Sequence, residues 1–226
     1  MKKLLFSSAL ILCTAGAFAQ EMGSKVARIG VKAGVNLSRI HYTGTNSNTL
    51  NDYTKDNVGY NFTVFGDFGV GENFFIQPGI SLQNKGTKLE GQIGTTTGTA
   101  KVDVMAIEIP VNAVFRVPTG DAGAFLISAG PYASFNIDGK NKTTVTSGAG
   151  QGTTETDLKF GNETSDNLTS TDFGANFGLG YRMSNGINIG ANYGLGLSNL
   201  VPKDSRAGND SKATNRILGF SVGYSF

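Results

Sequence analysis

The strongest constraint on the fold of this chain is a strict two-residue alternation of apolar and small or polar side chains. In the stretch 28–40, RIGVKAGVNLSRI, every odd-numbered residue from Ile29 to Leu37 is apolar, and the residues between them are glycine or polar. Successive side chains of a β-strand point to opposite faces, so the pattern predicts a strand with one apolar and one polar face. The apolar face must then either line a core or meet lipid.

The same alternation predicts eight strands, and each is longer than the five or six residues usual in soluble sheets. Ten residues at a tilt of about 45° cover the apolar thickness of an outer membrane. The chain therefore has the strand number and strand length of a small membrane barrel. The predicted strands are 28–40, 59–70, 72–84, 102–118, 124–137, 173–183, 187–198 and 218–226.

The connections between these strands alternate in length. Short turns alternate with four long polar segments, which are Ile40–Asn57, Asn84–Lys101, Asp138–Thr171 and Asn199–Lys212. In a meander this places every long loop at one end and both termini at the other. The sequence thus predicts an all-β fold, an eight-stranded antiparallel up-and-down transmembrane β-barrel with long extracellular loops and short periplasmic turns.

Charge placement indicates which face meets lipid. The polar face consists mostly of Gly, Asn and Ser, whereas the surface of a soluble eight-stranded barrel of the lipocalin type should be rich in charge. Lys or Arg facing lipid costs about 2–4 kcal/mol at mid-membrane, and the apolar face carries no charge in the centre of any segment. We expect the apolar face to point outward. The six charges of the polar face should form a structural network in the lumen: Lys32, Asp67, Glu108, Arg116, Asp172 and Arg182.

Glycine and asparagine occupy nearly all inward positions of the segments 173–183 and 187–198. Either bulky side chains fill this space from across the barrel, or a small cavity lies there. We expect Tyr132, Phe65 and Arg116 to fill it.

The N-terminus has the features of a secretory signal peptide at residues 1–19. Lys2 and Lys3 precede an apolar run, and Ala17-Phe18-Ala19 forms an A-x-A cleavage site. Cleavage near Ala19 leaves residues 20–226 as a single barrel domain. It also removes two of the 19 Lys and Arg residues, so 17 remain against 17 Asp and Glu, and this neutral balance argues against a nucleic-acid partner.

The C-terminus ends on a run of alternating apolar residues. This run resembles the signal by which the barrel assembly machinery recognises outer-membrane barrels. Its members are Leu218, Phe220, Val222, Tyr224 and Phe226.

Several stretches of the chain together resemble the PorT-like outer-membrane β-barrel proteins. They are GVKAGVNLSRI, FFIQPGISLQNKGTK, IEIPVNAVFRVP, DFGANFGLGYRM, YGLGLSNL and LGFSVGYSF. The resemblance implies a barrel fold and a place in the bacterial outer membrane. Most members have no assigned activity, and the secretion role of one branch is not transferred to this chain.

No candidate catalytic, cofactor or metal site emerges from the sequence. His41 is the only histidine, Cys13 lies in the signal peptide, and the glycines of 174–180 fall on one strand face with no helix after them. We expect a monomer without cofactors or enzymatic activity, surrounded by outer-membrane lipid, whose long loops are displayed at the cell surface for adhesion or for binding a partner protein. A periplasmic protein partner is expected if the chain is instead a secretion accessory. A transport or protein-secretion accessory is the alternative, and a soluble lipocalin-like carrier the second.

Overall fold

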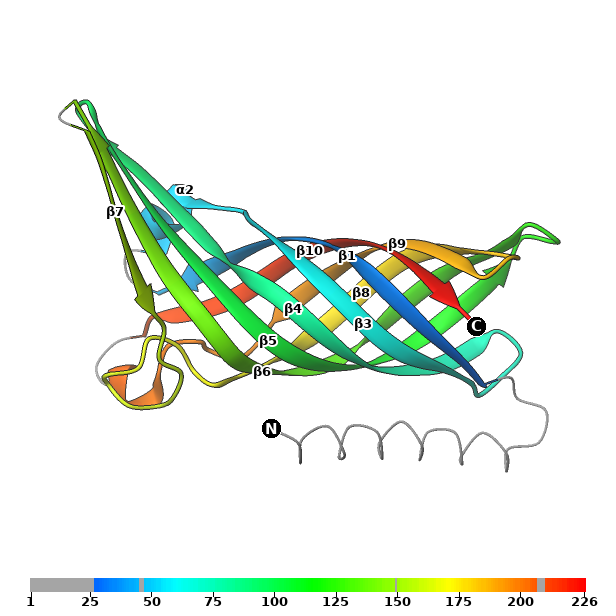
Figure 1. Ribbon diagram of the computed structural model, residues 1–226. Helices are drawn as coiled ribbons and strands as arrows, with labels where there is room; N and C mark the ends of the chain where they lie inside the picture. Colours follow the sequence, from blue (N-terminus) through cyan, green and yellow to red (C-terminus); the bar gives the residue numbers. More distant parts are fainter. Residues whose placement is uncertain (1–26, 45–46, 149, 207–209) are drawn as a thin grey trace, which may run out of the picture.

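The computed structural model describes residues 27–44, 47–148, 150–206 and 210–226, so the predicted signal peptide lies outside the described residues. The described chain is almost entirely β-structure (Figure 1). Its elements are β1 (Ala27–Thr43), α2 (Ser47–Tyr53), β2 (Thr54–Lys55), β3 (Asn57–Gly69), β4 (Phe74–Ile93), β5 (Thr96–Pro118), β6 (Gly123–Ser147), β7 (Gly150–Asp157), β8 (Thr171–Met183), β9 (Ile187–Gly196), the 3-10 helix η1 (Lys203–Arg206) and β10 (Lys212–Ser225).

Eight of these strands form a closed ring of antiparallel pairings. The order β1-β3-β4-β5-β6-β8-β9-β10 follows the chain, and β10 pairs with β1 from Gly30↔Ser225 to Thr43↔Lys212. Two further strands lie off the ring, β2 against β4 and β7 against β6, so the sheet has ten strands. The expected strand number of eight is therefore wrong for the whole sheet, because β2 and β7 lie within segments that the sequence indicated as loops.

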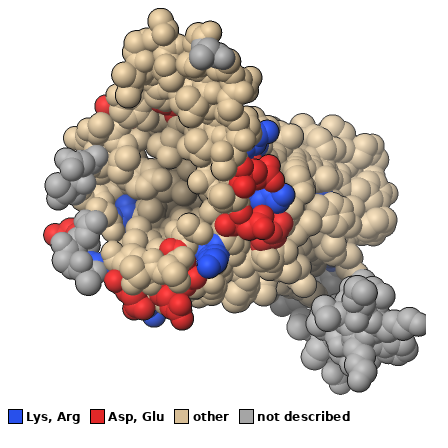
Figure 2. Space-filling view, turned by 60° about the vertical axis from the view of Figure 1, so that its left-hand side comes forward, with Lys and Arg blue, Asp and Glu red and all other residues tan. Residues whose placement is uncertain are grey.

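The two faces of the ring have the polarity that the alternation indicated. On β3, Tyr60 and Phe62 are each 50% exposed, whereas Asn61 and Thr63 between them are buried at 7% and 3%. Apolar side chains point outward and polar ones inward around the ring, and the wall carries few charged groups compared with the loop end (Figure 2). This contradicts the soluble lipocalin-like alternative, which requires an apolar interior.

Two of the four expected long loops are mostly strand. β4 runs on to Ile93 and β5 begins at Thr96, with Gly94 in the left-handed region (φ +59°) that a tight turn requires. Likewise β6 extends to Ser147, and β7 pairs back on it. Threonine favours strands, but water reaches both faces here, so no apolar alternation marks these strands in the sequence. We call this part, residues 88–101, 140–148 and 150–157, the projecting sheet (Figure 1).

In the described residues of the other two connections at this end, irregular structure accompanies short helical segments. Residues 44–56 contain α2 and the short β2, and residues 197–211 contain η1. Within the described ranges, no helix is long and apolar enough to cross a membrane.

Candidate functional site: the polar interior of the ring

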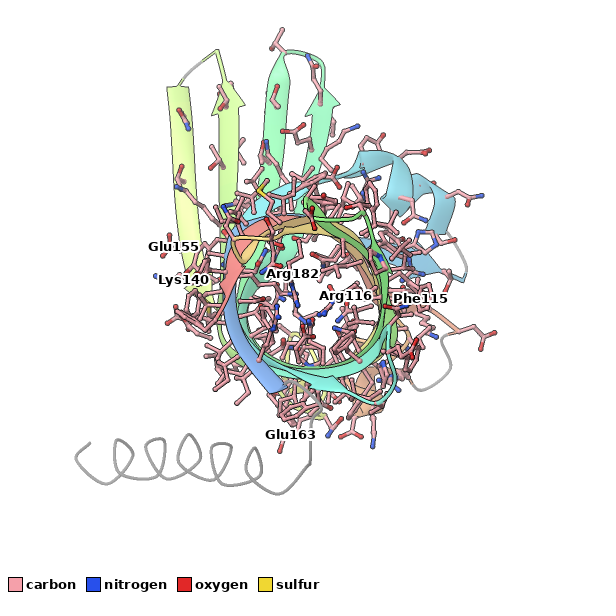
Figure 3. The ribbon with its side chains drawn as sticks, turned by 90° about the vertical axis from the view of Figure 1, so that its right-hand side faces the viewer. Phe115, Arg116, Lys140, Glu155, Glu163 and Arg182 are labelled. Atoms are coloured by element: carbon pink, nitrogen blue, oxygen red, sulfur yellow. The ribbon has the colours of Figure 1, made fainter. Side chains whose placement is uncertain are left out.

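One carboxylate lies close to two arginines near the turn end of the interior, which is the end of the ring where the short turns join the strands. Asp67, on β3, lies 3.3 Å from Nη2 of Arg116 and 2.6 Å from Nη1 of Arg182. Gln77 donates a further hydrogen bond to Asp67, at 3.0 Å. Arg116 and Arg182 come from β5 and β8, and both point into the ring, whereas Phe115 points outward (Figure 3). Asp67 thus joins strands that are not neighbours in the ring.

Each arginine of this turn-end cluster has a second contact. The guanidinium of Arg116 lies 3.9 Å from the centre of the Phe75 ring, a cation–π arrangement. Nε of Arg182 donates to the amide oxygen of Asn188 at 2.7 Å, and Asn188 donates in turn to Ser225 at 3.0 Å. The turn-end cluster is therefore tied to β9 and β10 as well.

A second cluster surrounds Asp172 near the loop end of the interior. Asp172 is 0% exposed and Lys85 only 1%, and their ion pair measures 3.3 Å. Nζ of Lys85 also donates to the hydroxyl of Ser134 at 2.8 Å. Three more side chains donate to the Asp172 carboxylate: Tyr132 at 3.2 Å, Asn215 at 2.7 Å and Ser198 at 2.6 Å.

Four donors on one carboxylate replace its lost hydration. A buried charge is tolerated only when it is paired and hydrogen-bonded, so this loop-end cluster has the composition of a satisfied structural site. An apolar cap lies beside it, since Ile40 and Leu200 line one small cavity together with Lys85. The members of the cap are Ile40, Leu200 and Ala213, with Tyr42, Leu168 and Val201 packed against them.

The middle of the interior is less tightly packed. Glu108 accepts a hydrogen bond from Asn176 at 3.1 Å, while Nζ of Lys32 lies 5.8 Å from the centre of the Phe65 ring. Lys32 lines two cavities of about 80 and 40 Å³, which have room for a few water molecules.

The six predicted interior residues thus fall into three groups. Asp67, Arg116 and Arg182 lie together in the turn-end cluster. Asp172 belongs to the loop-end cluster, and Glu108 and Lys32 lie between the two. Sequence reasoning missed Lys85, because the predicted connection Asn84–Lys101 includes it. The alternation could have found it, because Gln77, Ser81 and Lys85 share one parity on β4 and all three are buried.

The glycine-rich wall is filled only partly in the expected way. Tyr132 lies directly opposite Gly174 on the neighbouring strand, and a Cβ on Gly174 would come within 2.5 Å of the tyrosine ring. In the same way, Phe65 on β3 lies opposite Gly30 on the neighbouring strand β1, and its ring occupies the space beside that glycine. Tyr132 therefore fills part of the wall from the adjacent strand β6. Phe65 lies on β3, which pairs with neither β8 nor β9, and it lines the same cavity as Gly178 and Gly190 of the wall. Filling is also incomplete, because the larger cavity lies against Gly178, Gly180 and Gly190.

No metal-ligand cluster is present in the part of the chain that the structure describes: no three His, Cys, Asp or Glu side chains come together there. The residues of the predicted assembly signal form the outward file of β10, where Val222 is 61% exposed, and Phe226 follows at 72%. Recognition of this file by the assembly machinery stays a prediction.

Charged pairs on the projecting sheet are exposed. Nζ of Lys140 donates to Glu155 at 2.7 Å, and this hydrogen bond holds the pKa of the Glu155 carboxyl below its usual value (Figure 3). Such a pair contributes little to stability because water screens it.

A family model and several solved structures are similar to this chain. Solved structures similar to this chain include the attachment invasion locus protein Ail of Yersinia pestis (13% identity, 88% of this chain and 99% of that one, TM-score 0.38). Others are Neisserial surface protein A (12%, 89% and 99%, TM-score 0.42) and OprG of Pseudomonas aeruginosa (13%, 90% and 98%, TM-score 0.37). No curated protein sequence matches. Residues 18–201 match the family model described as the outer membrane protein beta-barrel domain, and the chain belongs to that family.

Proposed function

We propose that this protein is an eight-stranded outer-membrane β-barrel without enzymatic activity, which binds a partner protein at the cell surface through its projecting sheet. The observation that carries the proposal is the contrast between an interior with room for only a few water molecules and a sheet that continues beyond the ring with both faces in water. The membrane part then supplies a rigid base, and the projecting sheet supplies the contact surface.

The interior offers little room for transport. Two ion clusters and the apolar cap occupy it, and the cavities beside Lys32 measure only about 80 and 40 Å³. With eight strands, a barrel interior is just wide enough for side chains to fill it. We therefore expect no stepwise ion conductance from the purified protein in planar bilayers.

The projecting sheet presents a strand edge suited to binding an extended peptide. All eight residues of β7 are exposed, and β7 pairs with β6 alone among the strands of the described chain. The other edge of β7 thus has backbone N–H and C=O groups to which a partner segment can add as a further strand. In this proposal the partner protein therefore binds to a strand edge and not to the long loops that the sequence predicts.

Site-specific photo-crosslinking in intact cells tests the proposal. A photoreactive phenylalanine analogue at Thr154 on β7 should yield an adduct with a protein. The same analogue at Val222, in the outward file of β10, serves as the membrane-facing control and should yield none. Adducts from Thr119 in a turn at the opposite end, with none from Thr154, would instead support the secretion-accessory alternative.

Shortening the hairpin gives a second test. Asn141 and Thr156 are cross-strand partners, so residues 142–155 can be replaced by Asn-Gly, a two-residue turn that suits antiparallel strands. We expect this variant to keep the heat-modifiable gel mobility of a folded barrel and to lose the crosslinked partner from a probe at Thr99. If the partner is retained at Thr99, the edge of β7 is not the contact surface.

A further inference from the structure

Two arginines face outward from the wall of the ring, at the loop end of its apolar files. Arg39 on β1 and Arg216 on β10 are cross-strand partners. Leu37 and Leu218 form the next outward pair toward the turns. Beyond them the outward residues of both strands are apolar, from Val35 and Phe220 onward. The arginines thus mark the point where the apolar surface ends.

The charge of Arg216 has no carboxylate partner within the described residues. Its Nη1 donates to the carbonyl of Gly196 at 3.0 Å, the carbonyl of Asn215 at 2.8 Å and the hydroxyl of Thr214 at 2.9 Å. These acceptors are neutral, so they fix the guanidinium in place without compensating its charge. An uncompensated cation beside a membrane is stabilised by an anion.

Arg39 is compensated, and its partner is also part of the site. Asp56 accepts two hydrogen bonds from Arg39, from Nε at 2.6 Å and from Nη2 at 2.9 Å. This bidentate pair neutralises the carboxylate that would otherwise repel an anion at Arg216.

The space between these groups is an open groove of about 410 Å³ on the outer wall. Its loop-end part is lined by the two arginines, His41 and Asp56, and its other part by Leu37, Leu218 and Tyr193. A groove that is cationic at one end and apolar at the other matches a molecule with an anionic head and hydrocarbon chains. Arginine suits a phosphate head because its planar N–H groups match phosphate oxygens.

We propose that this groove binds the phosphate-bearing head group of an acylated lipid of the outer leaflet. Arg216 supplies the uncompensated charge, and Leu37 and Leu218 contact the first methylene groups of the acyl chains. The site rests on the proposed function, since it requires the ring to span a membrane.

The test compares two lipids that differ only in phosphate. The purified protein in detergent micelles is titrated with phosphatidic acid or with diacylglycerol of the same acyl chains, and bound lipid is counted by native mass spectrometry. We expect phosphatidic acid to bind at least tenfold more tightly. Equal retention of the two lipids overturns the proposal. Competition by inorganic phosphate at the concentration of the lipid also overturns it, because the ligand would then be free phosphate.

A substitution in the groove tests whether the preference for phosphatidic acid over diacylglycerol arises there. Arg216→Gln should remove the tenfold preference, while Lys212→Gln, which removes an exposed cation of the same strand outside the groove, should leave it within twofold. An Arg216→Gln protein that keeps the full preference overturns the assignment. The two-lipid comparison uses the unaltered protein, so it decides the matter even if the variant does not fold. Failure of the unaltered protein to insert into lipid vesicles would refute the proposed function, whereas insertion without phosphate preference refutes only this site.

Discussion

Replacing Lys85 by methionine tests whether the loop-end cluster stabilises the ring. Methionine has a similar length and no charge, so the change leaves Asp172 buried without its cation. Removing one partner of a buried ion pair costs about 3–5 kcal/mol, which corresponds to a decrease of about 10²–10⁴-fold in the folding equilibrium constant. Lys85 and Asp172 are almost completely buried, so solvent screening does not reduce this figure.

The converse change, Asp172→Asn, leaves Lys85 uncompensated and should cost a similar amount. The double variant should lie within about 2 kcal/mol of the unaltered protein, because replacing both charges of a buried pair by neutral groups is often nearly neutral. The coupling energy between the two positions should therefore be at least ~3 kcal/mol.

Guanidinium unfolding of the refolded protein in lipid vesicles measures these differences. The chain contains no tryptophan, so unfolding is followed by far-ultraviolet circular dichroism and by heat-modifiable gel mobility. Lys88→Met is the matched control, since Lys88 lies on the same strand and pairs with Glu90 in an exposed position, where a pair is worth at most ~1 kcal/mol. Additive effects of Lys85→Met and Asp172→Asn, or a loss below 1 kcal/mol for Lys85→Met, would refute the reasoning.

Three further changes probe the wall and its assembly. Gly174→Val should prevent ring closure, because even a Cβ there would lie 2.3 Å from a backbone oxygen, whereas Gly98→Ala has free space and should assemble normally, as heat-modifiable mobility would show. Val222→Arg puts a charge into the apolar file and should cost about 2–4 kcal/mol of unfolding free energy in vesicles, while Val145→Arg on the projecting sheet should cost under about 0.5 kcal/mol. Deletion of Phe226 should slow assembly into outer-membrane fractions, measured by pulse-chase, without changing the guanidinium midpoint of the refolded protein by more than its experimental error.

The sequence predicts which face of a strand each side chain lies on, because this depends only on whether its position along the strand is odd or even. Tyr60 faces out and Asn61 faces in for the same reason that their neighbours do, and no distant residue is needed to decide it. The projecting sheet could not be predicted in this way. Thr144 and Thr153 are cross-strand partners with hydroxyls 3.2 Å apart, yet both faces of their strands meet water, so no apolar period accompanies them.

The sequence pattern around each interior charge also does not predict which residue the charge pairs with. Arg116 and Arg182 both meet Asp67, although they lie 49 and 115 positions away along the chain. Which strand faces which across the interior depends on the tilt and stagger of the whole ring, and these follow from all the pairings together. The sequence therefore predicts which residues enter the interior but not which of them meet.

The ion clusters in the interior favour one register between neighbouring strands, which the alternation of apolar and polar residues alone does not select. A slip of one residue between two strands reverses their faces and is excluded by the apolar pattern. A slip of two residues keeps every apolar side chain outward, so the lipid-facing surface does not oppose it. It would, however, move Asp67 by about 6–7 Å relative to its arginines, at ~3.3 Å per residue. Buried charges would then lose their partners at a cost of several kcal/mol. The apolar faces thus select a family of registers, and the interior carboxylates Asp67 and Asp172 select one register from that family.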